Sequence, residues 1–177
     1  MIRKIIILAA ILIVAAAAFG YFTGGVSMKA YTNQTLGFEI EYPETWRSEE
    51  CTYEQYGIVS FGDHAEPLLI CNSDAPPLSY INVNVIGPAG DLEGLLKNTF
   101  EGLDNSRRSD DKLDGKPAVR IYGETRPTEG PGVPVGTKMT FVFAEHSGKI
   151  YLVSHWNLEN KDYLSEFEQM LKSFQFL

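Results

Sequence analysis

The sequence predicts an α+β fold in which an antiparallel β-sheet is covered by helices, as in an α/β/α sandwich. Period-two alternation of apolar and polar residues dominates from Lys29 onward, whereas only two segments have the apolar spacing of helices. The predicted strands adjoin mainly through hairpins, which favours antiparallel pairing. With 44% hydrophobic and 21% charged residues, the 177-residue chain has an ordinary globular composition. One domain is therefore expected over residues 29–177.

The predicted domain begins with a short strand. Phe38, Ile40 and Tyr42 alternate with glutamates, and Pro43 ends the strand. Trp46 follows, and its large apolar side chain is expected to fold back and be buried in the core. Further strands are predicted at Gly57–Gly62, Leu68–Cys71, Tyr80–Ile86, Ala118–Glu124, Lys138–Glu145 and Lys149–Trp156. A turn at Ser147-Gly148 makes the last two a hairpin.

Two stripes of apolar residues at helical spacing predict the helices. One extends from Leu92 to Leu103, with Asp91 as a plausible N-cap. The stronger one extends from Tyr163 to Phe174, and the chain then alternates as a short final strand would. Trp46 and Phe174 are both expected to be buried in the same layer of the fold.

The N-terminal residues 1–25 are a targeting segment and lie outside the predicted domain. Arg3 and Lys4 precede an uninterrupted apolar run that begins at Ile5. A cleaved signal peptide explains this run, because Ala15-Ala16-Ala17 or Ala18-Phe19-Gly20 in its last part would suit a cleavage site. An uncleaved anchor also explains it, since residues 5–22 reach the about 18 apolar residues that a membrane-spanning helix needs. A lipid bilayer is then a partner of residues 5–22.

Both interpretations place the folded domain outside the cytoplasm. Arg3 and Lys4 remain on the cytoplasmic side of the membrane under the positive-inside rule. The expected location is therefore the cell membrane, with a single span and an external C-terminal domain. The alternative is a secreted or periplasmic protein after signal cleavage.

Two cysteines, Cys51 and Cys71, gain significance from an external location. They are compatible with one disulfide, which would stabilise the domain by roughly 3 kcal/mol in the chain-entropy model. Two small buried thiols are the alternative. A zinc site is excluded, because neither cysteine has a second cysteine or a histidine at the close spacing that structural zinc requires.

Four short motifs occur in order along residues 29–177. They are Leu36-Gly37-Phe38-Glu39-Ile40-Glu41-Tyr42-Pro43-Glu44-Thr45-Trp46, Leu113-Asp114-Gly115-Lys116-Pro117-Ala118, Gly148-Lys149-Ile150-Tyr151-Leu152-Val153 and Leu171-Lys172-Ser173-Phe174-Gln175-Phe176. In this order the motifs resemble the PsbP-like family of the Mog/PsbP superfold, and the targeting segment suggests an exported prokaryotic member. The resemblance implies a binding or assembly module, since members of the family include photosystem II extrinsic subunits and a Ran-binding nuclear import factor. A manganese-cluster role is not implied.

Candidate catalytic and metal-binding groups are scattered. His146 and His155 lie on two arms of one predicted hairpin, but in a register that separates them. The acidic run from Asp110 to Asp114 lacks the closing glutamate of a calcium loop and is expected to form a turn, with Gly115 at positive φ. The polar segment 63–66 is expected to be a turn. We therefore expect no catalytic residues, no bound metal and no cofactor.

The sequence thus favours a non-catalytic, membrane-tethered PsbP-like module that binds an unknown protein or small ligand outside the cell. The alternative is an exported hydrolase or metal-dependent enzyme with a site built from dispersed loops. Nucleic acid is not an expected partner, because the chain is net negative, at −8, and lacks a basic stripe. The candidate interaction surface is a Pro/Gly loop. Its residues are Thr128, Glu129, Pro131, Val133 and Pro134.

Overall fold

A computed structural model describes residues 26–52, 56–63, 81–87, 91–127, 134–158 and 162–177 of the chain. The strands are β1 (Met28–Asn33), β2 (Phe38–Pro43), β3 (Arg47–Thr52), β4 (Tyr56–Gly62), β5 (Ile81–Ile86), β6 (Leu103–Leu113), β7 (Lys116–Thr125), β8 (Lys138–His146), β9 (Lys149–Trp156) and β10 (Gln175–Phe176). The helices are α2 (Leu92–Glu101) and α3 (Leu164–Ser173). Among the described residues no helix is long and apolar enough to span a membrane, and residues 1–25 lie outside them.

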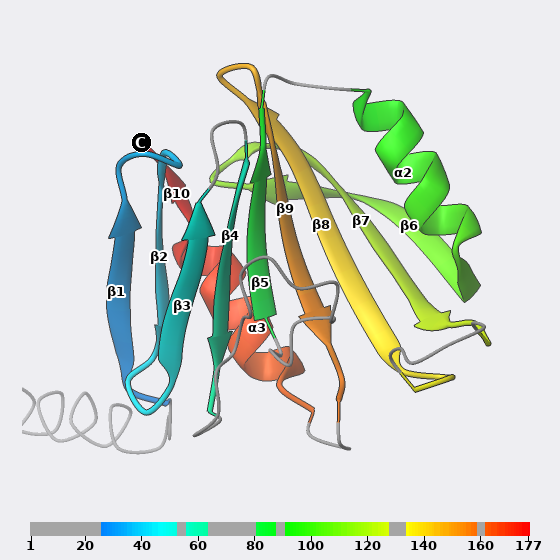
Figure 1. The fold of residues 1–177 in the computed structure, drawn as a ribbon, viewed down its shortest axis with the longest axis horizontal. Helices are drawn as coiled ribbons and strands as arrows, with labels where there is room; N and C mark the ends of the chain where they lie inside the picture. The colour runs from blue at the N-terminus through cyan, green and yellow to red at the C-terminus, as the bar shows by residue number, and fades with distance from the viewer. Residues whose placement is uncertain (1–25, 53–55, 64–80, 88–90, 128–133, 159–161) are drawn as a thin grey trace, which may run out of the picture.

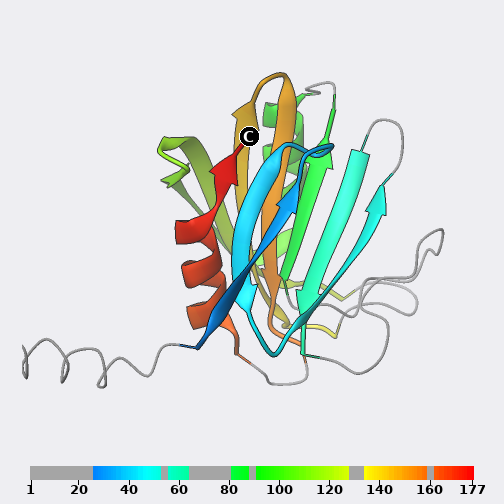
Figure 2. The ribbon, with the colours of Figure 1, turned by 90° about the vertical axis from the view of Figure 1, so that its left-hand side faces the viewer.

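The strands form two antiparallel sheets. Seven strands form the large sheet in the order β3-β4-β5-β9-β8-β7-β6, and three form a small sheet in the order β1-β2-β10. Helix α2 lies on one face of the large sheet, whereas α3 and the small sheet lie on the other (Figures 1 and 2). We call these the α2 face and the α3 face. The predicted sheet with helices on both sides is confirmed, but the separate small sheet was not predicted.

Aromatic side chains dominate the core on the α3 face. Phe38 of β2 stacks on Phe174, with ring centroids 5.5 Å apart, and Phe174 is 1% exposed. Trp46 is 5% exposed and meets the ring of Tyr163 edge-on at 4.8 Å. The predicted burial of Trp46 and Phe174 in one core is therefore confirmed.

Local signals for turns and caps predicted the structure well. Ser147 and Gly148 have φ of 49° and 73°, the left-handed backbone that a two-residue hairpin turn requires. Gly115 has φ 70°, as predicted. The Asp91 side chain caps α2 by accepting a hydrogen bond from Gly94 N at 2.8 Å.

Three predictions need correction. The acidic run is not a turn: Asp110 and Asp111 lie within strand β6, and the turn begins only at Asp114. Leu103 is not the last helical residue but the first residue of β6. Strand β3 was also missed. β6 escapes detection because it is an edge strand whose mostly exposed polar residues do not alternate with apolar ones.

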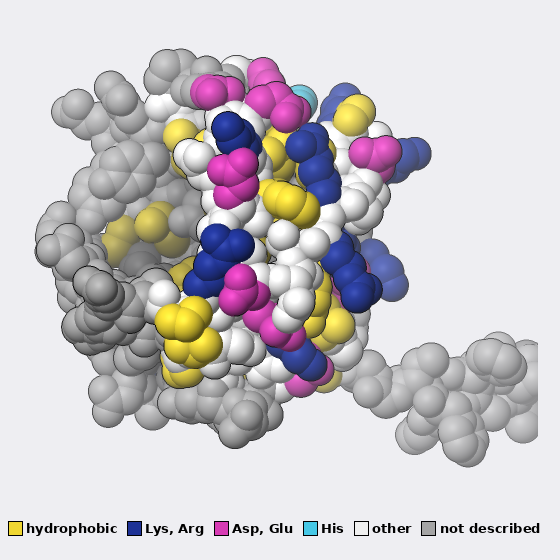
Figure 3. All heavy atoms as spheres, turned by 90° about the vertical axis from the view of Figure 1, so that its right-hand side faces the viewer, with side chains coloured by type: hydrophobic (Ala, Val, Ile, Leu, Met, Phe, Trp, Pro, Cys, Tyr) yellow, Lys and Arg dark blue, Asp and Glu magenta, His cyan; other side chains and the backbone are white. Residues whose placement is uncertain are grey.

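Lysine and arginine side chains are interspersed with aspartate and glutamate on the face that carries α2 and β6 (Figure 3). Arg108 of β6, for example, lies 3.4 Å from Glu93 of α2, and Arg126 lies 2.7 Å from Asp104. All four side chains are largely exposed, so these pairs contribute little to stability. Charges of both signs on this edge instead oppose pairing with another strand.

Candidate functional site

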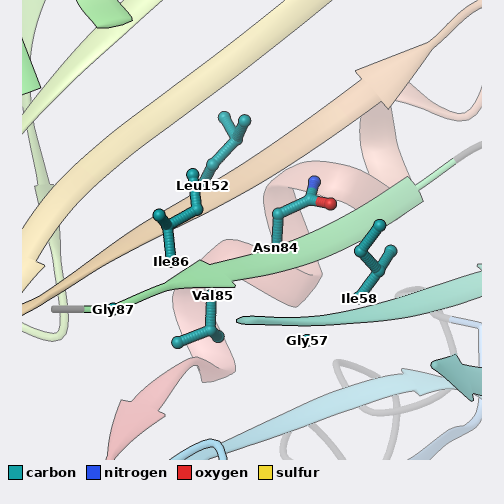
Figure 4. A pocket seen from close by; sticks show the side chains of 7 residues that line it. All are labelled: Gly57, Ile58, Asn84, Val85, Ile86, Gly87 and Leu152. Carbon is teal, nitrogen blue, oxygen red and sulfur yellow. The ribbon is translucent and has the colours of Figure 1, made fainter. Parts of the chain in front are cut away.

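A hollow of about 490 Å³ opens where β4 begins and β5 ends, beside the middle of the large sheet. The described residues that line it come from β4, β5 and β9, and from the residue after β5. They are Gly57, Ile58, Asn84, Val85, Ile86, Gly87 and Leu152 (Figure 4). Small-molecule pockets in proteins have volumes of roughly 300–1,000 Å³, so the hollow has the size of a ligand site.

Strand alternation decides which side chains form the floor of the hollow. Ile58, Asn84 and Leu152 occupy one cross-strand row, because Asn84 is the register partner of Ile58 in β4 and of Leu152 in β9. Ile86 extends from β5 on the same side, whereas Val85 points to the opposite side and into the core (Figure 4). The floor is therefore three aliphatic side chains around one amide.

The hollow belongs to the α2 face of the sheet. Ile86 and Leu152 pack against the apolar cluster under α2, whose most buried helical residue is Leu96 at 1% exposure. Val83 of β5 and Val153 of β9 point to the opposite side of the sheet and belong to the core on the α3 face. The floor residues are therefore held between a rigid core below and the α2 cluster beside them.

Asn84 is the polar group at the centre of this floor. Its side chain is half-buried, and no hydrogen bond joins its amide to another described residue. Asn82, one row along β5 on the same face, contrasts with it: Asn82 is 2% exposed and accepts a hydrogen bond from Ser60 Oγ at 2.7 Å. Asn82 therefore has a structural role, whereas the amide of Asn84 is available to a ligand.

Gly57 lines the hollow at a point where the turn between β1 and β2 approaches β4 closely. A Cβ atom at this position would lie 2.4 Å from Cδ2 of Leu36, in the turn between β1 and β2. The glycine therefore lets the small sheet pack closely on the start of β4. Tyr151 and Lys149 of β9 hold that turn by donating hydrogen bonds to the Leu36 carbonyl at 3.0 and 3.3 Å.

The described side chains that line the hollow include no acid, base or nucleophile. The described lining residues are aliphatic, glycine or asparagine, so a ligand would meet one amide and backbone groups. Within the described part of the chain, no group of three histidine, cysteine, aspartate or glutamate side chains could hold a metal ion. This set of described lining residues suits the binding of a neutral molecule.

The two histidines of the β8–β9 hairpin lie far apart. His146 pairs with Lys149 at the turn and stacks on Phe176 at 4.4 Å. His155 lies six residues further along β9, roughly 20 Å away at the rise of a strand. It is 3% exposed, and burial lowers its pKa below the usual 6.5. The two imidazoles do not form a common site.

The carboxylates of the acidic run have separate structural partners. Asp111 accepts a hydrogen bond from Arg120 Nε at 2.7 Å, and Arg120 also pairs with Glu168 of α3. Hydrogen bonding to Glu168 is the main cause that raises the pKa of Arg120. Asp114 accepts a hydrogen bond from Phe176 N at 3.1 Å. These pairs attach α3 and β10 to the large sheet.

A polar cluster joins the edges of the two sheets. Tyr31 of β1 donates a hydrogen bond to Glu50 of β3, and Asn33 Nδ2 donates to Glu50 at 2.9 Å and to Tyr31 at 3.0 Å. Burial, followed by the hydrogen bond to Glu50, raises the pKa of Tyr31 to about 12. The cluster is a structural bridge, since its groups pair with one another.

Several predicted site residues lie outside the described residues. These are Cys71, Thr128, Glu129, Pro131 and Val133. Cys51 is 5% exposed in β3, and there is no free cysteine among the described residues. The Cys51–Cys71 disulfide stays a prediction.

Pro134 is the member of the predicted interaction loop that the structure describes. Its carbonyl accepts hydrogen bonds from Thr125 Oγ1 at 2.5 Å and Thr137 Oγ1 at 2.6 Å. The next residue, Val135, is 64% exposed. One end of the Pro/Gly loop is therefore firmly attached beside an exposed apolar side chain.

The hollow, and Asn84 as a residue of a candidate site, were not predicted from the sequence. The one available signal was the pair Asn82 and Asn84 at period two within an otherwise aliphatic strand, since asparagine is depleted in strands. That pattern indicates a polar face, and it does not show which of the two amides lacks a partner.

Comparison with known proteins supports the fold. No family model matches the sequence, and no curated protein matches it. Among solved structures, the chain is similar to the solution structure of cyanobacterial PsbP (CyanoP) from Synechocystis sp. PCC 6803, with a TM-score of 0.52 and 17% sequence identity. The match covers 88% of this chain and 96% of that chain. At this identity the likeness concerns the fold alone, and the chain has a PsbP-like α+β fold.

Proposed function

We propose that this chain is a non-catalytic binding module with a PsbP-like fold that holds a small, largely apolar ligand in the hollow on its α2 face. The observation that carries the proposal is the row Ile58, Asn84 and Leu152, in which aliphatic side chains surround one unpaired amide. Most ligand pockets have this composition, with an apolar lining and a few polar groups that orient the ligand.

The proposed location is outside the cell membrane of a prokaryote. Arg3, Lys4 and the apolar residues 5–22 support export, with either an uncleaved anchor or a cleaved signal peptide. The interspersed charges on the face of α2 and β6 do not resemble the basic stripe of a nucleic-acid-binding protein (Figure 3). The alternative, an exported hydrolase or metal-dependent enzyme, gains no support from the residues that line the hollow.

The proposal is tested by nuclear magnetic resonance on the full chain in lipid nanodiscs, with ¹³C-labelled isoleucine and leucine methyl groups. The probe is 4-butylacetophenone, which is neutral and fits a pocket of this size. We expect saturable shifts of the Ile58, Ile86 and Leu152 methyl signals. The methyl signals report on the hollow itself, so partition of the probe into lipid does not mimic binding.

A matched pair of tryptophan variants provides the control. Ile58→Trp narrows the hollow and should abolish the shifts at Ile86 and Leu152. Val135→Trp places the same side chain on an exposed position outside the hollow and should leave them intact. Shifts that persist in Ile58→Trp, or that never occur in the wild-type protein, would contradict the proposal.

The Pro/Gly loop from Thr128 to Pro134 stays our proposed contact for a protein partner. The hydrogen bonds that attach Pro134 support it, because a fixed end lowers the entropy cost of presenting a loop. Deletion of residues 129–133 should abolish partner recovery from native membranes and leave the thermal midpoint nearly unchanged. Partner recovery by the deletion variant would count against this contact.

A further inference from the structure

We infer that the hollow selects ligands with a neutral amide edge, in which a hydrogen-bond donor and an acceptor lie side by side, on an apolar body. Primary carboxamides and lactams are the simplest members of this class. The inference rests on the proposed function, because it names the ligand class of the same site. It depends on Asn84, on the aliphatic side chains around it, and on the fact that the described lining residues carry no charge.

Asn84 is an energetically costly residue at this position of β5. A half-buried amide without a partner loses part of its hydration and gains no hydrogen bond in return. β5 lies third in the large sheet, with β4 and β9 on its two sides, so an aliphatic residue would suit this position better. Its row neighbours, Ile58 and Leu152, are aliphatic. The amide therefore loses part of its hydration at this position, and a ligand that pairs with it would restore the lost hydrogen bonds.

The amide of Asn84 is best paired by a ligand that has a donor and an acceptor side by side. An asparagine side chain presents a carbonyl oxygen that accepts and an NH₂ group that donates, at adjacent positions. A group that only accepts, such as a ketone, satisfies the NH₂ and leaves the oxygen unpaired. A cis-amide edge satisfies both atoms of Asn84 at once, as two amides do when they pair.

Charged ligands do not suit the described lining of the hollow. A carboxylate can pair with the NH₂ of Asn84, but no lysine, arginine or histidine is among the described residues that line the hollow. An ammonium group can pair with the oxygen, but these residues include no aspartate or glutamate either. A charge placed among Ile58, Ile86 and Leu152 would lose hydration without a counter-ion among the described lining residues, which is costly. A neutral donor–acceptor edge avoids this cost.

The test compares two probes of the same shape. In 4-butylbenzamide an NH₂ group replaces the acetyl methyl of 4-butylacetophenone, so only the amide has an N–H donor beside its carbonyl oxygen. Dissociation constants are measured from the Ile58, Ile86 and Leu152 methyl shifts of the full chain in nanodiscs. We expect the amide to bind about tenfold more tightly, since the ketone leaves the Asn84 oxygen unpaired.

Asn84→Leu should reduce this preference to less than twofold while the ketone still binds. Asn98→Leu, the same substitution at an exposed position of α2, should keep the tenfold preference. Equal binding of the two probes to the wild-type protein would overturn the amide inference and leave the proposed function standing. A preference that survives in Asn84→Leu would also overturn it. Absence of methyl shifts with both probes would overturn the proposed function and the inference together.

Discussion

We expect His155 to make the stability of this domain dependent on pH. The ring lies on the α3 face, 3% exposed, with its centroid 5.5 Å from that of Phe167 in helix α3. Among the described residues, Nε2 has no hydrogen-bond partner. Burial lowers the pKa of His155, and the negative charges of Asp162 and Glu168 oppose that shift. The guanidinium of Arg120 lies over the Phe167 ring, at 5.9 Å from its centroid.

The direction of the pH effect depends on whether the folded or the unfolded chain binds the proton of His155 more readily. Because the pKa of His155 is lower in the folded state than the usual 6.5, the unfolded chain binds this proton more readily below about pH 6.5. Above pH 6.5 His155 is neutral in both states, so its contribution to the free energy of unfolding is fully present. It falls as the pH drops from 6.5 toward the folded pKa, by at most about 1.4 kcal/mol per pH unit for one proton.

The assay measures the free energy of urea unfolding between pH 7.5 and 5.0 for the wild-type protein and His155→Gln. At pH 7.5 the variant should be less stable, because it loses the ring contact with Phe167. Below pH 6.5 the difference should narrow, since glutamine does not titrate. Other groups titrate in both proteins, so their contributions cancel in the difference.

Thr140→Val is the matched control for this measurement. Thr140 is 4% exposed and is the register partner of His155 across β8 and β9. Its substitution perturbs the same region but removes no titrating group. The difference between wild-type and Thr140→Val should therefore stay constant with pH. A constant difference for His155→Gln as well would refute the reasoning.

Three further outcomes are expected. Trp46→Ala and Phe174→Ala should each lower the free energy of urea unfolding by about 3–5 kcal/mol, because each removes a buried ring from the α3-face core; losses under 1 kcal/mol would contradict that role. Thiol titration of denatured, unreduced protein should find Cys51 and Cys71 oxidised, and two free thiols would reject the disulfide. Protease added to intact cells stripped of outer layers should remove residues 29–177, whereas a protected domain would contradict external location.

Elements with local causes were predictable from the sequence. The β8–β9 hairpin follows from two alternating segments around Ser147-Gly148, which adopt the positive φ that such turns require. Helix α2 follows from its apolar spacing and from Asp91, whose side chain caps the first turn. These features depend on residues within a few positions of one another, so their physical causes are visible in the order of residues alone.

The sequence by itself thus determined the secondary-structure periods, the hairpin turns and the apolar residues of the core. Only the tertiary structure decided that β2 pairs with β10 in a second sheet, since Phe38 and Phe176 are neighbours through long-range packing. It also decided that β6 is a strand, because pairing with β7 orders a segment whose polar residues have no strand pattern. Asn84 became a candidate site residue for the same reason: whether an amide finds a partner depends on the rows of neighbouring strands, which local sequence does not specify.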